Sequence, residues 1–179
     1  DRWVIARLHQ TTQTVTGGME LYDTAVACQS LTGFIEDLST WYLRRSRDRL
    51  KEGNDSDRAN AVRTLAHVLH TLSKLMAPIT PFISEEIHQA LRKECPSLKE
   101  SVHLEEWPVF DAKKIDETLL HQMESTRGVV SQALEIRDKE KMPVRQPLSS
   151  LSVNGLVVPP EFASIIQDEV NVKKIISHT

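Results

Sequence analysis

Positively charged side chains gather in one short stretch of this 179-residue sequence, whose formal net charge is −3. The segment from Arg44 to Lys51 holds four arginines and one lysine, against the single acid Asp48. Arg and Lys bind phosphate oxygens, so this surplus is typical of an anion-binding surface. The negative total charge excludes a protein that is basic throughout, but not a local patch. The candidate phosphate-binding residues here are Arg44, Arg45, Arg47, Arg49 and Lys51.

A second basic stripe follows on the next predicted helix. Its members recur at i, i+4, i+7 and i+11, and they are Arg63, His67, His70 and Lys74. One such stripe is often only a solvated helix face, whereas two on consecutive helices favour a phosphate-binding edge. Trp41 is a candidate for stacking on an unpaired base, although its place beside the apolar stripe of its helix favours packing.

Catalytic and metal-binding motifs are absent from the sequence. It contains no Gly-rich phosphate loop, no His-Glu-x-x-His and no Gly-x-Ser-x-Gly. His67 and His70 could share a metal ion, but no neighbouring carboxylate or thiol completes a ligand set. Cys28 and Cys95 lie far apart, which predicts reduced thiols and no cysteine-based zinc site. We therefore expect no catalytic residue and no metal ligand in this chain.

The composition and spacing predict a mainly α fold in a cytoplasmic protein. Aromatic residues are only 5% of the sequence, which disfavours a β-sandwich. No apolar run approaches the length of a membrane span, so we expect no membrane partner. Four helices joined by short loops favour an antiparallel bundle over residues 1–110. Residues 111–179 are expected to form a helix followed by a small C-terminal α/β appendage.

Local signals place the helices of the bundle. The first begins near Val4 and either ends at Gly17-Gly18 or continues to Glu20. The second starts after the N-cap Asp23 and runs through Tyr42 into the basic stretch. The third is capped by Asp55 or Ser56, ends at Ala77 before Pro78, and buries Val62, Leu65, Ala66, Leu69, Leu72 and Met76. The fourth covers Phe82 to Arg92.

The later part of the chain changes character. We expect an extended segment from Ser101 to Trp107 and a helix from Asp111 to about Lys139. Leu151–Val153 and Val172–Ile176 have strand composition, and Pro160–Gln167 can form a short helix between them. This β–α–β interpretation competes with a hairpin at Asn154-Gly155.

Several stretches, read together, resemble one protein family. Glu36–Arg49, with its Trp-Tyr-Leu-Arg-Arg-Ser-Arg core, resembles the second-helix signature of isoleucyl-tRNA synthetases, with Thr40 where the common form has Asn. Met76–Ile87 resembles a turn shared by the synthetases for isoleucine, valine, leucine and methionine. Ser101–Pro108 is similar to the segment that follows this turn. Val144–Leu148 and Asp168–Lys173 are similar to late motifs of the isoleucine enzyme, which usually have Leu in place of Val170.

The resemblance covers nearly the whole chain, in the expected order. It implies the helical anticodon-binding domain of a class I synthetase, whose partners are tRNA(Ile) and the catalytic and editing domains of the same polypeptide. The adenylate-forming signatures His-Ile-Gly-His and Lys-Met-Ser-Lys-Ser are missing. ATP and Mg²⁺ would thus belong to the parent enzyme, with no cofactor in this chain and no activity of the chain alone. Two alternatives are the same domain of valyl-tRNA synthetase and a helical protein-interaction scaffold.

Overall fold

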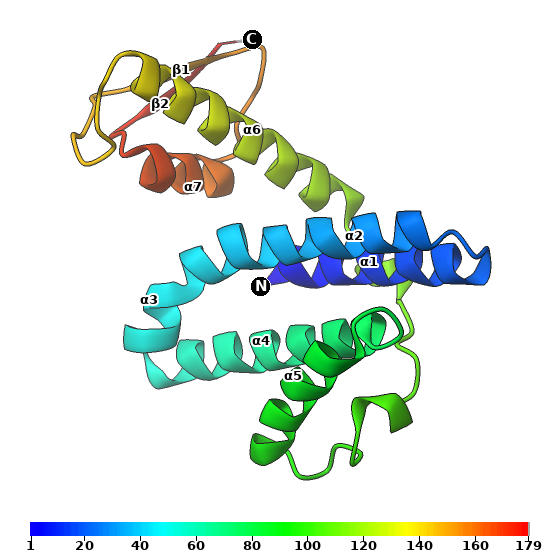
Figure 1. Ribbon diagram of the computed structural model, residues 1–179. Helices are drawn as coiled ribbons and strands as arrows, with labels where there is room; N and C mark the ends of the chain where they lie inside the picture. The colour runs from blue at the N-terminus through cyan, green and yellow to red at the C-terminus, as the bar shows by residue number, and fades with distance from the viewer. Residues whose placement is uncertain (179) are drawn as a thin grey trace. The chain divides into compact units, whose positions relative to one another are not determined.

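A computed structural model describes residues 1–178 (Figure 1). The chain divides into two compact units, Asp1–Asp116 and Glu117–Thr179. The predicted division, after residue 110, lies shortly before this one. Helices dominate the element order, which confirms the predicted mainly α fold class. Within the described residues, no helix is both long enough and apolar enough to cross a lipid bilayer.

The first unit is built from helices that pack in sequential pairs. In Figure 1, α1 and α2 run side by side, and α5 packs against α4. Their buried contacts are made by side chains such as Leu8, Val15, Phe34, Val68 and Leu75. The elements of this unit are α1 (Arg2–Glu20), α2 (Thr24–Glu36), the π-helix η1 (Asp37–Leu43), α3 (Arg44–Glu52), α4 (Asp55–Met76), α5 (Pro81–Glu94) and the 3₁₀ turns η2 (Val102–Leu104) and η3 (Ala112–Lys114).

Helix α1 continues through Gly17 and Gly18 to Glu20, so the longer of the two predicted helices is the one that forms. The packing of α1 on α2 explains one of the two glycines. A Cβ atom at Gly18 would lie 3.0 Å from the carbonyl oxygen of Asp23 and 3.2 Å from the amide nitrogen of Ala27. A Cβ at Gly17 would have nothing within 4 Å. The close approach of the two helices therefore requires a glycine at position 18 but not at position 17.

This difference predicts opposite effects of the same substitution at adjacent positions. Gly17→Ala should raise the free energy of unfolding by about 0.5–1 kcal/mol, because it removes the conformational cost of a helical glycine. Gly18→Ala should lower it by about 1–2 kcal/mol, because the backbone of α2 would have to move. Urea unfolding of both variants measures the difference. Equal effects at the two positions would contradict this account of the helix contact.

Predictions for α4 were correct at its end and for the burial of Leu72, but wrong at its start and for Val62. The other four residues predicted to be buried, Leu65, Ala66, Leu69 and Met76, are only partly buried. The helix ends before Ala77, as predicted. Its N-cap is Asn54, whose side-chain oxygen accepts the Asp57 N–H at 2.9 Å, and neither Asp55 nor Ser56 fills that role. Val62 is 49% exposed, because the neighbouring Ala61, together with Val68, lies on the face of α4 that packs. The buried positions are Ala61, Val68, Thr71, Leu72, Ser73 and Leu75.

Two short 3₁₀ turns, η2 and η3, form where an extended segment and the start of a helix were predicted. Residues 101–107 are not simply extended, because η2 forms where the Ser101 hydroxyl accepts the His103 N–H at 3.2 Å. Glu85 of α5 holds this turn by accepting the Val102 N–H at 2.9 Å. The helix expected from Asp111 begins only at Glu117, since the Asp111 carboxylate accepts the Lys113 N–H and caps η3 instead.

The second unit confirms the β–α–β interpretation and shows that the hairpin alternative was wrong. It consists of α6 (Glu117–Lys139), β1 (Leu151–Asn154), α7 (Pro160–Val170) and β2 (Ile175–His178). The two strands are parallel, with Leu151 opposite Ile175. Parallel strands require a crossover connection, and α7 supplies it. The second strand starts later than predicted because Asn171, at φ 53°, ends α7 in a left-handed conformation, while Val172 forms an isolated bridge with Leu148.

A buried arginine holds the connections of this unit together. Arg137, near the end of α6, is only 2% exposed. Its guanidinium group donates to the carbonyl oxygens of Pro143 at 3.1 Å, Gln146 at 2.9 Å and Asn171 at 3.2 Å. The segment between α6 and β1 and the end of α7 are therefore joined through one side chain.

Candidate nucleic-acid interface

The basic stretch lies on α3, which continues from α2 through the π-helical segment η1. Two hydroxyl groups bond back to the preceding turn here: Ser39 Oγ donates to the Ile35 carbonyl at 2.7 Å and Thr40 Oγ1 to the Glu36 carbonyl at 2.6 Å. Such bonds compete with the regular helical ladder, and π-segments are rare insertions that often occur at functional sites. Figure 1 shows the helical run changing direction between α2 and α3.

Three cations of the stretch face solvent, as the helical spacing predicted. Arg44, Arg47 and Lys51 are exposed and lie along one side of the helical run. They border a surface hollow of about 480 Å³ that Leu43 and Leu50 also line. Exposed cationic side chains around an open hollow can bind phosphate groups. These three residues make up what we call the basic edge.

Arg49 is held differently, by two carboxylates. Its Nε donates to Asp57 at 2.9 Å, and its two terminal nitrogens donate to Asp1, each at 2.9 Å. The hydrogen bond from Arg49 lowers the pKa of the Asp57 carboxyl below its usual range, which keeps the pair ionised at neutral pH. This arrangement supports a role for Arg49 in joining α3 to the start of α4. Arg45 is half-buried, and an RNA contact by either residue stays a prediction.

Trp41 lies within the core at the base of the basic edge. Its side chain is 8% exposed, and the Arg44 guanidinium carbon lies 5.7 Å from the centre of its ring. Stacking on a nucleotide base requires an open ring face, and little of this one is accessible. The burial favours the packing role over the base-stacking role.

The second stripe is divided by the packing of α4. Arg63 and His67 are exposed, and Lys74 is half-buried. His70 does not face solvent as predicted, because its ring packs against that of His88 with the centres 5.9 Å apart. Desolvation, followed by the charges of Lys114 and Lys74, lowers the pKa of His67 below its ordinary value of 6.5. At neutral pH the positive charge of this stripe therefore comes mainly from the exposed Arg63 and the half-buried Lys74.

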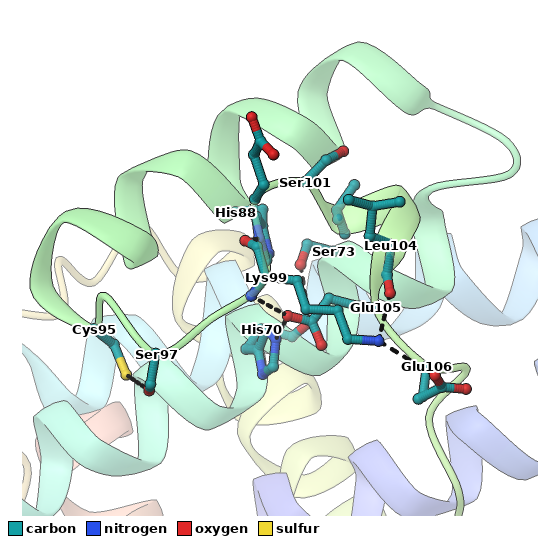
Figure 2. Close-up of polar contacts among 12 residues, drawn as sticks. His70, Ser73, His88, Cys95, Ser97, Lys99, Ser101, Leu104, Glu105 and Glu106 are labelled. Atoms are coloured by element: carbon teal, nitrogen blue, oxygen red, sulfur yellow. Dashed lines mark hydrogen bonds and ion pairs between the residues drawn. The ribbon is translucent and has the colours of Figure 1, made fainter.

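Packing also assembles a polar cluster that residue spacing does not reveal. His70 of α4, His88 of α5 and Glu105, just after η2, come from three separate segments (Figure 2). His67 and His70 were the only pair considered for a metal ion from the sequence. The partners of His70 are instead 18 and 35 positions away along the chain. No local motif could have identified them, because only the packing of α5 and η2 on α4 brings them together.

The helical first unit, its exposed basic edge and the motifs of the sequence agree with a comparison against protein-family models. Residues 1–152 match the model described as the anticodon-binding domain of tRNA ligase. The chain belongs to this family.

Three similar proteins are all isoleucine–tRNA ligases. The chain is 42% identical to the isoleucine–tRNA ligase of Streptomyces coelicolor over 99% of its length. It is 41% identical to the enzyme of that name from Thermobifida fusca and 39% identical to that of Thermus thermophilus, each over 98% of its length. These relatives agree with the isoleucine interpretation and not with the valine alternative. The chain spans only 17–18% of their lengths.

Proposed function

We propose that this chain binds the anticodon stem and loop of tRNA(Ile) as part of an isoleucine–tRNA ligase in the cytoplasm. The observation that carries the proposal is the basic edge, where Arg44, Arg47 and Lys51 are exposed around one hollow. Family membership and the named relatives support the same function. The backbone of a stem and loop offers phosphates at regular intervals, which suits cations spaced along a helix.

The chemistry of aminoacylation belongs to other parts of the parent enzyme. The parent would join isoleucine to tRNA(Ile) with ATP and Mg²⁺, in a catalytic domain assisted by an editing domain of the same polypeptide. This chain lacks the adenylate-forming signatures, so its contribution is recognition and positioning of the tRNA. Positioning a substrate lowers the entropic part of a reaction barrier, which is how a remote binding surface contributes to catalysis.

Removing single cations from the basic edge should weaken binding without unfolding the protein. We expect Arg47→Ala and Lys51→Ala each to change the free energy of unfolding by no more than about 0.5 kcal/mol, as at most exposed positions. If each side chain contacts one phosphate, each variant should weaken all tRNAs equally and reduce the slope of log K against log salt by about 1 or slightly less. Fluorescence anisotropy titrations at several salt concentrations measure both quantities.

A matched control and a swapped tRNA test the specificity of this surface. Lys93→Ala removes the same charge from an exposed position on α5, and it should leave the salt slope unchanged. Wild-type chain should bind tRNA(Ile) more tightly than the same tRNA carrying a valine anticodon. Binding without salt dependence would contradict the proposal and favour the protein-interaction scaffold. Preference for the valine anticodon would contradict the assignment to isoleucine.

A further inference from the structure

The cluster of His70, His88 and Glu105 has the geometry of a ligand set. One donor atom from each residue lies within 4.8 Å of the other two. His70 Nε2 is 3.8 Å from Glu105 Oε1, and the two side chains are only 23% and 12% exposed. His88 is fully buried. Figure 2 shows all three side chains directed into the same space between α4, α5 and the segment after η2.

The hydrogen bonds of His88 define which of its nitrogens is available. Its Nε2 lies 2.9 Å from the carbonyl oxygen of Lys99. A carbonyl can only accept, so Nε2 carries the proton and Nδ1 of the neutral ring presents a lone pair. In the part of the chain that the structure covers, this buried Nδ1 has no hydrogen-bond partner. A buried acceptor without a partner is costly, and it points to a missing ligand.

His70 presents a second buried nitrogen, 3.8 Å from the Glu105 carboxylate. Its buried Nε2 also lacks a hydrogen-bond partner within residues 1–178. Burial, followed by the positive charge of Lys74, lowers the pKa of His70 below 6.5, although Glu105 acts in the opposite direction. The ring is therefore mostly neutral at pH 7, and a neutral imidazole is the form that binds a metal ion.

Glu105 supplies an oriented carboxylate. Its Oε1 accepts the backbone N–H of Lys99 at 3.0 Å. Burial alone would raise the pKa of Glu105, but this hydrogen bond and the charge of Lys74 lower it on balance, so the group is ionised at pH 7. The backbone of Lys99 thus orients two of the three side chains, through its carbonyl group to His88 and its N–H to Glu105. Protein metal sites use outer hydrogen bonds of this kind to fix their ligands.

We propose that His70, His88 and Glu105 bind one zinc ion, or a similar divalent transition metal, that links α4, α5 and the segment after η2. Two imidazole nitrogens and one carboxylate oxygen form a known ligand set for such ions, with the fourth position left to water. Zinc binds these donors at about 2.0–2.2 Å. Donor atoms up to 4.8 Å apart would therefore have to move closer together when it binds.

Metal titration of the 179-residue chain, prepared without a polyhistidine tag, tests the proposal. Co²⁺ serves as the probe, because its visible absorption reports a four-coordinate site, and Zn²⁺ is then added as a competitor. We expect one Co²⁺ per chain, displaced by Zn²⁺. Loss of an outer-shell partner typically weakens metal binding 10–100-fold, so loss of a ligand in His70→Gln or Glu105→Gln should weaken it by at least about 100-fold.

Three further variants separate a site from general metal affinity and from misfolding. His103→Gln and His121→Gln remove exposed histidines and should leave Co²⁺ binding unchanged. Lys74→Met removes a nearby positive charge and should tighten it. Circular dichroism checks that each variant is folded. The test uses His70 and Glu105, which are half-buried, because replacing the fully buried His88 would put folding itself at risk. The proposal would be overturned if the cobalt absorption did not appear, or if Glu105→Gln bound Co²⁺ as tightly as the wild type. Either result would leave the proposal of tRNA binding unaffected.

Discussion

Trp41→Ala is expected to lower the free energy of unfolding of the first unit by about 3–5 kcal/mol, the usual cost of truncating a buried tryptophan. The side chain is 8% exposed, so the substitution leaves a cavity beneath the basic edge. Cavities are not fully closed by relaxation, because protein interiors are close-packed. Affinity for tRNA should fall only to the extent that the protein unfolds, because the burial of the ring favours packing over stacking. Urea unfolding and tRNA titration well below the melting temperature measure the two effects separately.

A control substitution at an exposed aromatic residue tests whether the loss of stability in Trp41→Ala comes from the burial of the side chain. Phe82 lies in the first turn of α5 and is 92% exposed. Phe82→Ala should change the free energy of unfolding by no more than about 0.5 kcal/mol. A Trp41→Ala protein that stays fully stable but no longer discriminates between anticodons would show instead that the indole stacks on a base.

Arg137→Met is expected to lower the free energy of unfolding of the second unit by about 2–4 kcal/mol, since hydrogen bonds to a charged group contribute about 1.5–3 kcal/mol each. The carbonyls of Pro143 and Asn171 keep a backbone donor, from Gln146 and Leu148 respectively. The loss should therefore be smaller than three such bonds would suggest. Methionine fills much of the space of the arginine stem, so the comparison isolates the guanidinium group.

Two further variants test whether the stability depends on the hydrogen bonds of the Arg137 guanidinium group or only on its charge. Arg137→Lys keeps the positive charge but cannot reach three carbonyls at once, so most of the stability should still be lost. Lys139→Met, at an exposed cation two positions along α6, should have an effect within about 0.5 kcal/mol. Hydrogen exchange should locate the loosening in residues 143–178. If Arg137→Lys were as stable as the wild type, the carbonyl contacts would not be what stabilises this unit.

The basic edge depends on a neighbouring arginine that holds its helix in place. Arg49 joins α3 to Asp57 at the start of α4 and to Asp1 beside α1. These contacts hold the last turns of α3 against the rest of the first unit. Arg47 and Lys51, on the same turns, are left exposed. One group of arginines in the sequence therefore includes a side chain held by carboxylates and others that are exposed, which charge counting alone does not distinguish.

Residue spacing was sufficient to predict most helices and the exposure of the basic edge. The apolar stripe after Asp23 and the proline at 78 predicted where α2 begins and α4 ends, because caps and prolines act on the adjacent backbone. The cations that follow Tyr42 were correctly placed in solvent by their angular positions. The motifs around Trp41 also identified the family, because they extend over consecutive residues and can be recognised in the sequence without knowledge of the fold.

Tertiary structure alone decided the contacts between segments that are distant in sequence. Asn154-Gly155 is a sound hairpin signal, yet α7 packs on α6 and buries Phe162, Ile166 and Val170, which makes the parallel crossover the better solution. The partners of Arg49 and Arg137 and the meeting of His70, His88 and Glu105 depend on how whole helices pack. Short-range patterns report the preferences of the local backbone, whereas the distance between two remote side chains is set by the burial of apolar surface elsewhere in the molecule.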